Sequence, residues 1–145
     1  MKSLKNALCI LLLLMSSLCH AGGNIVVVVP AHSEVDKLSR DEVINIFLGR
    51  LRQFPNGAAA YPLDLPAGQV EKAHFYRLLV NKDLSEINAY WARLIFSGRT
   101  SPPQLARSNE DVIEQLASNP NAIAYLERSK ADRRVKIVLD LGAAP

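Results

Sequence analysis

Cysteine is nearly absent from this sequence of 145 residues: Cys9 and Cys19 are the two copies, and both lie close to the N-terminus. The rest of the chain therefore has no thiol for a disulfide or a nucleophile. It also has no further apolar run long enough to cross a bilayer. Its charges nearly balance, with 17 Lys and Arg against 14 Asp and Glu. Without a strong excess of positive charge, nucleic acid is not an expected partner.

Catalytic signatures are missing as well. The sequence has no G-x-S-x-G elbow, no H-E-x-x-H pair and no P-loop. Past the N-terminal segment it has His32 and His74, which are far apart in the chain, and no ligand-type residues stand at metal spacing around either. We therefore expect neither an enzyme nor a bound metal or other cofactor.

The first 21 residues have the pattern of a secretory signal peptide. Lys2 and Lys5 precede an apolar run that is too short to span a bilayer, and Ala21 closes a small-x-small cleavage pattern. We expect cleavage to leave residues 22–145 as a single domain outside the cytoplasm, either periplasmic or secreted, with no membrane span once the signal is removed.

Beyond the signal, predicted strands and helices alternate. Strands are expected near 24–29, 60–64, 122–126 and 135–139, and helices near 40–48, 69–80, 85–96 and 110–117. The run "NIVVVVP" is typical of a strand buried on both faces. Ser39 and Glu42 have the spacing of a capping box, and Asn109 is the expected cap of the last helix. This order predicts an α/β fold, a mixed sheet flanked by helices.

Two further stretches have simple structural interpretations. In the helix near 85–96, Ile87, Trp91, Leu94 and Ile95 share one face, which we expect to be buried. The run "ERSKADRRVK" mixes both signs of charge and indicates a solvated turn.

Ligands of α/β folds bind at the carboxyl ends of strands, which points to the loops near 30–33 and 65–69. The stretch "PLDLPAGQVEK" predicts a strand, a tight turn and the start of a helix, a backbone arrangement that binds anions. We expect an amide rim at Gly68 to Val70, helped by His32 across the strand ends. The candidate ligand-binding residues are His32, Ser33, Asp64, Gly68, Gln69, Val70 and Arg99.

Five stretches resemble one family. They are "LSRDEVINIFLGRLRQFPNG", "YPLDLPAG", "FYRLL", "YWARLIFSGR" and "NPNAIAYL". Together they resemble one lobe of the phosphate-binding proteins of ABC importers, which have the type II periplasmic binding-protein fold. Full receptors of this family have two lobes that close on the ligand, and this chain is long enough for one.

The resemblance weakens where those receptors bind phosphate. They carry an Arg-x-Asp-Gly-Ser-Gly-Thr run at the strand–helix joint, and the corresponding positions here, from the arginine onward, include Leu65, Ala67, Gly68, Gln69, Val70 and Glu71. The arginine and both hydroxyls are missing, and each lost charge-assisted hydrogen bond is worth about 1.5–3 kcal/mol. Glu71 and Asp64 would also repel an anion.

Two functions remain open at this point. One is a solute-binding-like protein related to phosphate transport, with a degenerate oxyanion site that holds a small anion or another small solute weakly. The other is a non-catalytic interaction module of a cell-envelope complex, which binds an envelope protein or a second copy of itself.

Overall fold

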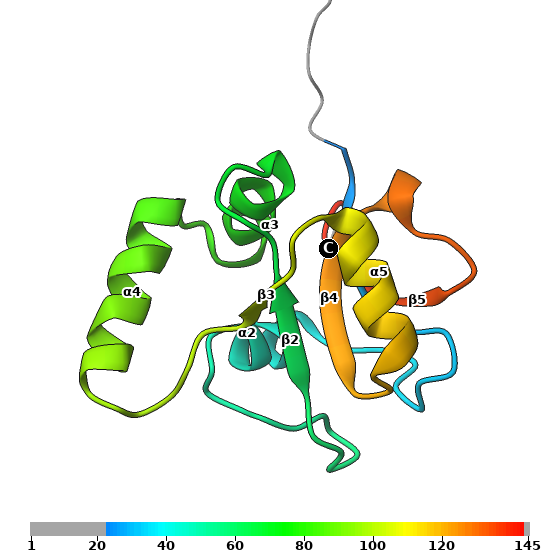
Figure 1. Ribbon diagram of the computed structural model, residues 1–145, viewed down its shortest axis with the longest axis horizontal. Coiled ribbons are helices and arrows are strands. Elements are labelled where there is room, and N and C mark those ends of the chain that lie inside the picture. Colours follow the sequence, from blue (N-terminus) through cyan, green and yellow to red (C-terminus); the bar gives the residue numbers. More distant parts are fainter. Residues whose placement is uncertain (1–22, 144–145) are drawn as a thin grey trace, which may run out of the picture.

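The computed structural model describes residues 23–143 as a five-stranded sheet with helices on both faces (Figure 1). The strands are β1 (Ile25–Pro30), β2 (Tyr61–Asp64), β3 (Gln104–Leu105), β4 (Ala122–Glu127) and β5 (Val135–Asp140). The helices are α2 (Arg40–Phe47), α3 (Val70–Val80), α4 (Leu84–Phe96) and α5 (Asn109–Ser118), with a short 3-10 turn η1 (Arg128–Lys130). The predicted α/β class and the four predicted strands and helices are confirmed; β3 was not predicted.

The sheet is mixed, in the order β3-β2-β4-β1-β5. β2 runs parallel to both β3 and β4, whereas β1 runs antiparallel to both β4 and β5. All six residues of β1 are buried, which confirms the expectation from its continuous apolar run.

These directions decide which loops share an edge of the sheet. Because β2 and β4 are parallel and β1 opposes β4, the carboxyl ends of β2 and β4 lie beside the start of β1. The loop after β1, near 30–33, therefore lies at the opposite edge from the loop near 65–69. The expectation that these two loops meet was wrong, because an apolar run shows that a strand is buried but not which way it points.

The helix ends follow the local sequence in most places. The Ser39 and Glu42 capping box is present at the start of α2, and Gly49 follows the end of this helix with a φ of 69°. The expected cap of α5 was wrong by one residue: Ser108 is the N-cap, and its Oγ accepts from the N–H of Asp111 at 3.1 Å.

An aromatic cluster lies at the centre of the core, between α2, α3 and β4. The rings of Phe75 and Tyr125 stack with centroids 3.8 Å apart, and Phe47 meets Phe75 edge-on at 4.9 Å. Since these rings come from three elements, the cluster fixes the position of α3 against the sheet.

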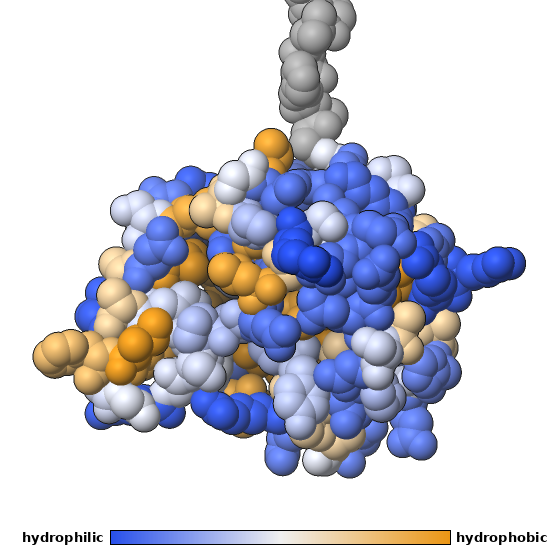
Figure 2. Space-filling model, viewed as in Figure 1, coloured by the Kyte–Doolittle hydropathy of each residue, from blue (hydrophilic) through white to orange (hydrophobic). Residues whose placement is uncertain are grey.

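α4 lies to one side of the sheet, packed on α3 (Figure 1). Ile87 and Trp91 are buried as expected, and Leu94 is half-buried. The expectation for Ile95 was wrong, because its side chain is 55% exposed, and the neighbouring Phe96 is 97% exposed. Figure 2 shows hydrophobic atoms gathered on the side of this face that α4 occupies, whereas the side over α5 is mostly hydrophilic.

Within residues 23–143, every helix is too short or too polar to cross a lipid bilayer. The proposed signal segment and cleavage point, residues 1–22, lie outside the described residues.

Candidate functional site

The predicted strand, turn and helix are present where β2 passes into α3. The N–H of Gln69 donates to the carbonyl of Pro66 at 3.0 Å, which closes a tight turn, and α3 begins at Val70. Gln69 is the N-cap, but its side chain makes no capping hydrogen bond. The first turn of α3 therefore presents N–H groups that need an acceptor from elsewhere.

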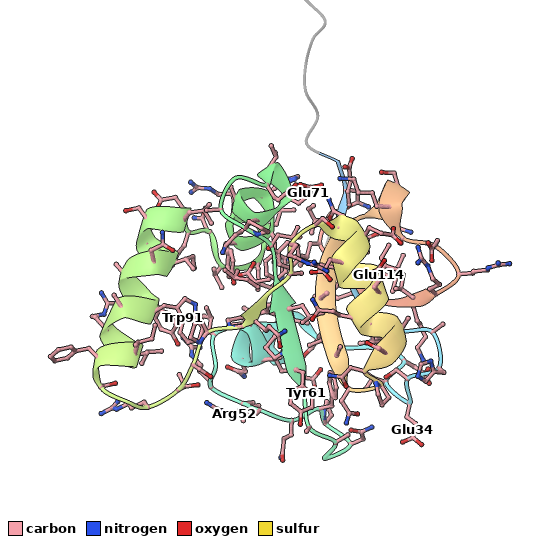
Figure 3. The ribbon with its side chains drawn as sticks, viewed as in Figure 1. Glu34, Arg52, Tyr61, Glu71, Trp91 and Glu114 are labelled. Carbon is pink, nitrogen blue, oxygen red and sulfur yellow. The ribbon has the colours of Figure 1, made fainter. Side chains whose placement is uncertain are left out.

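Glu71 is the second residue of α3, so its carboxylate lies at this end of the helix. Its Oε1 accepts from the Nδ2 of Asn109 at 3.1 Å and from the ammonium of Lys130. Because Asn109 is the first residue of α5, the N-terminal ends of α3 and α5 both meet at this carboxylate, which lies near the top of Figure 3. The residue is only 8% exposed. An acidic side chain of the protein itself is therefore held at a point suited to an anion.

Its partners keep Glu71 ionised. Burial raises the pKa of the Glu71 carboxyl, but hydrogen bonds from Lys130, from its own backbone N–H and from Asn109, together with the charge of Lys130, outweigh burial and leave the pKa below its usual value. The group is consequently a carboxylate at neutral pH.

The charge around this corner is negative. The Nζ of Lys130 lies 4.0 Å from the Oε2 of Glu127 as well as bonding Glu71, so one ammonium faces two carboxylates. A small cavity of about 300 Å³ opens beside them, and Gly68, Gln69, Val70 and His74 line part of its wall. Any free anion that enters must approach an excess of negative charge.

A second carboxylate, that of Asp64, is buried where β2 ends. Its Oδ2 accepts from the hydroxyl of Tyr76 at 2.8 Å and lies 3.3 Å from the Nζ of Lys72, while its Oδ1 accepts from the hydroxyl of Tyr125 and from the N–H of Leu65 at 2.8 Å. Asp64 is 4% exposed, and these donors replace the water that it lost on burial.

The two tyrosines act as donors in this network. Burial raises the pKa of both phenols, and the nearby negative charge of Asp64 raises it further, so both stay protonated across the physiological range. The Asp64 network is internally satisfied and has no free group aimed at solvent, which is typical of a structural network rather than of a reactive site.

The structure divides the predicted site residues among three places. Asp64, Gly68, Gln69 and Val70 lie together at the start of α3. Gly68 has no positive φ, and a Cβ there would meet nothing within 4 Å, so the turn does not require glycine. The amide rim stays a prediction.

His32 and Ser33 lie at the opposite edge of the sheet, beside a cavity of about 230 Å³. Arg99 follows α4, next to Thr100, in a segment that borders the start of β2 and not its end. The expected help from His32 at the amide rim was therefore wrong. A ligand role for these three residues elsewhere stays a prediction.

The partners of Glu71 were not predicted from the sequence. Lys130 was assigned to a solvated turn, and Asn109 was assigned to a helix cap. A signal for Lys130 did exist, because it follows β4 by three residues and β4 ends at the same edge as β2. Among residues 23–143, no group of three or more His, Cys, Asp and Glu side chains is arranged to hold a metal ion.

The comparisons with known proteins give a fold but no sequence family. No family model matches the chain, and no curated protein matches it. Several solved structures do. An ABC-type phosphate transport receptor from Vibrio cholerae aligns with a TM-score of 0.65 at 15% identity. The alignment covers 85% of this chain and 48% of the receptor.

Two other structures agree with it. PstS from Borrelia burgdorferi aligns with a TM-score of 0.60 at 13% identity. The alignment covers 85% of this chain and 49% of PstS. A phosphate ABC transporter substrate-binding protein from Clostridium perfringens, solved with bound phosphate, aligns with a TM-score of 0.63 at 16% identity. The alignment covers 80% of this chain and 44% of the Clostridium perfringens protein.

In each comparison the chain spans less than half the length of the protein that it matches. The mixed sheet, its flanking helices and this partial coverage together confirm the expected architecture. The chain therefore has the fold of about half of a phosphate ABC transporter substrate-binding protein.

Proposed function

We propose that this chain is an exported, non-catalytic binding lobe whose oxyanion position is occupied by its own Glu71, and that it serves as an interaction module of a cell-envelope complex. The observation that carries the proposal is the Glu71 carboxylate, bonded to Asn109 and Lys130 where the N-termini of α3 and α5 meet. The periplasmic or secreted location is part of the proposal and rests on the composition of residues 1–21.

Competition with Glu71 opposes tight phosphate binding. A side chain tethered a few bonds from its site has an effective concentration on the order of millimolar or more, which a free anion must exceed. The carboxylate of Glu127, which also lies beside Lys130, repels an incoming phosphate. The arginine and hydroxyls of the full receptors have no counterpart at the matching positions of this sequence.

Titration calorimetry with inorganic phosphate tests the proposal. We expect no binding heat with the wild-type protein at micromolar concentrations. Glu71→Ser removes the internal carboxylate and frees Lys130 and the first N–H groups of α3, so we expect weak, roughly millimolar phosphate binding to appear in this variant. Glu114→Ser is the matched control, because Glu114 is an exposed glutamate on α5, away from this corner (Figure 3).

A low-micromolar phosphate dissociation constant for the wild-type protein, weakened by Gly68→Val, would overturn the proposal. It would mean that the turn at Gly68 binds phosphate with Glu71 in place. Gln69→Ala is expected to leave folding intact, since the Gln69 side chain makes no capping bond.

Weak binding of a small solute is the second candidate function. The cavity of about 300 Å³ beside Gln69 and His74 is the observation that favours it. Its volume lies at the lower end of ligand pockets, roughly 300–1,000 Å³. A thermal-shift screen with neutral and cationic small molecules as well as oxyanions separates this function from the first, because a bound solute raises the melting temperature.

A further inference from the structure

A groove of about 410 Å³ lies at the other end of β2, away from Glu71. Three segments form its walls: the end of α2 with the turn after it (46–52), the start of β2 (59–62), and residues 100–104 before β3. The hydrophobic side chains of Leu51 and Tyr61 border it and are 46% and 53% exposed. The groove therefore offers apolar surface to a partner.

The charge around the groove is positive. Arg52 is its one charged lining residue, and the Nη2 of Arg52 donates to the Oγ1 of Thr100 at 2.9 Å, which positions the guanidinium at the rim. Arg50 and Arg99 are exposed and adjoin lining residues in the chain. Within residues 23–143, none of these three arginines forms a salt bridge, whereas Arg128, Lys130, Arg134 and Lys136 all do.

We infer that this groove docks an extended segment of a partner protein in which an acidic side chain stands next to a bulky apolar one. Charge complementarity supplies the argument: an unpaired, pre-positioned arginine at the rim of an apolar groove fits a carboxylate beside an apolar side chain. The inference rests on the proposed role as an interaction module and gives that role a surface and a partner chemistry.

The backbone limits how the segment can bind. Pro62 has no N–H, and Leu63 and Asp64 already pair with β3. A partner strand therefore cannot extend the sheet along β2 at the groove. The segment must bind through its side chains. A concave groove of this size also suits side chains better than the flat surface of a bilayer.

Selection from a displayed library of random peptides, with the purified protein as bait, tests the inference. We expect enriched peptides to combine Asp or Glu with Leu, Ile, Phe or Trp. The strongest of them, labelled with fluorescein, is then measured by anisotropy. Arg52→Glu reverses the charge at the rim, and Ala59→Trp fills the groove without changing charge, so each should weaken binding by about tenfold or more.

Arg133→Glu is the matched control, because Arg133 is an exposed arginine in the turn before β5, and it should bind the peptide as the wild-type protein does. Failure to enrich acidic–apolar peptides, or peptide binding that survives both Arg52→Glu and Ala59→Trp, would overturn the inference. So would wild-type binding to phosphatidylglycerol vesicles that Arg52→Glu abolishes, together with no peptide binding, since this would assign the surface to lipid.

These outcomes are separable from the proposed function. Failure of the peptide selection, with phosphate still unbound, would reject the groove and leave the self-occupied anion position standing. Tight phosphate binding by the wild-type protein would reject the proposed function whatever the groove binds.

Discussion

Glu71 and Asp64 are two acidic residues that the chain uses as internal acceptors. Each is buried at the carboxyl end of β2 or the start of α3, and each has a lysine and neutral donors as partners. Removing one partner of such a group leaves a buried charge without its hydrogen bonds, which costs more than the bond itself contributed. Both carboxylates therefore stabilise this corner while reducing its affinity for a free anion.

The lowered pKa of Glu71 predicts a pH dependence of stability. Because the pKa of Glu71 in the folded protein lies below that of a glutamate in the unfolded chain, the stabilisation is fully present above the unfolded-state pKa and is lost as the pH falls through the folded-state pKa. Near neutral pH, we expect the unfolding free energy of the wild-type protein to exceed that of Glu71→Gln by about 1–2 kcal/mol. We expect this difference to vanish once the pH has fallen below the folded-state pKa of Glu71.

Urea unfolding across this pH range measures the difference. Glu114→Gln controls for the loss of an exposed carboxylate and should follow the wild-type curve. If the unfolding free energies of Glu71→Gln and the wild-type protein differed by the same amount at every pH, the contacts of the Glu71 carboxylate with Lys130 and Asn109 would not stabilise the fold.

At the scale of elements, α4 contacts the turn after α2 through a hydrogen bond and through the ring of Trp91. The hydroxyl of Tyr90 donates to the carbonyl of Leu48 at 2.6 Å, and the ring of Trp91 passes over Gly49. A Cβ on Gly49 would lie 2.9 Å from the Cη2 of Trp91, and the φ of Gly49 is 69°. Glycine at this position is required both by the backbone and by the packing of α4.

Three glycine substitutions separate these two effects. Gly49→Ala combines a positive φ with the clash and should destabilise by roughly 1–3 kcal/mol. Gly57→Ala has a φ of 85° but meets no neighbour, so it should cost less. Gly68→Ala has neither problem and should be neutral or slightly stabilising.

Chemical denaturation followed by tryptophan fluorescence reports directly on α4, because Trp91 is the single tryptophan. A Cβ on Gly49 would also lie 2.9 Å from the Oγ1 of Thr100, so equal losses for Gly49→Ala and Gly57→Ala would show that close contact with Trp91 and Thr100 adds nothing.

The sequence predicts most elements but fewer of their relations. The capping box at Ser39 and the apolar run of β1 each depend on a few neighbouring residues, so the structures that they predict are present. The direction of β1, the exposure of Ile95 and the contact of Lys130 with Glu71 depend on residues far away in the chain. The departure from the phosphate receptors at Glu71 was visible in the sequence, but the partners that hold its carboxylate were not.

At the scale of the whole molecule, we expect the chain to be exported. Expression of the full sequence in a Gram-negative host, followed by fractionation and N-terminal sequencing, should find a periplasmic protein that begins at Gly22. Leu12→Arg combined with Leu13→Arg interrupts the apolar run and should keep the protein in the cytoplasm. Retention of residues 1–21 in the exported protein, or a lipid on Cys19, would contradict the expectation.

The interior place of β1, between β4 and β5, also bears on the order in which the protein can fold. Among the five strands of residues 23–143, β1 is synthesised first, yet its two neighbours, β4 and β5, are the last two. Until they appear, six residues that are buried in the finished sheet have no partner. Pairing across most of the chain is also slow, because a large loop must close first. A nascent chain therefore cannot pair β1 until β4 and β5 have been synthesised, and we expect an exported chain to remain unfolded until then.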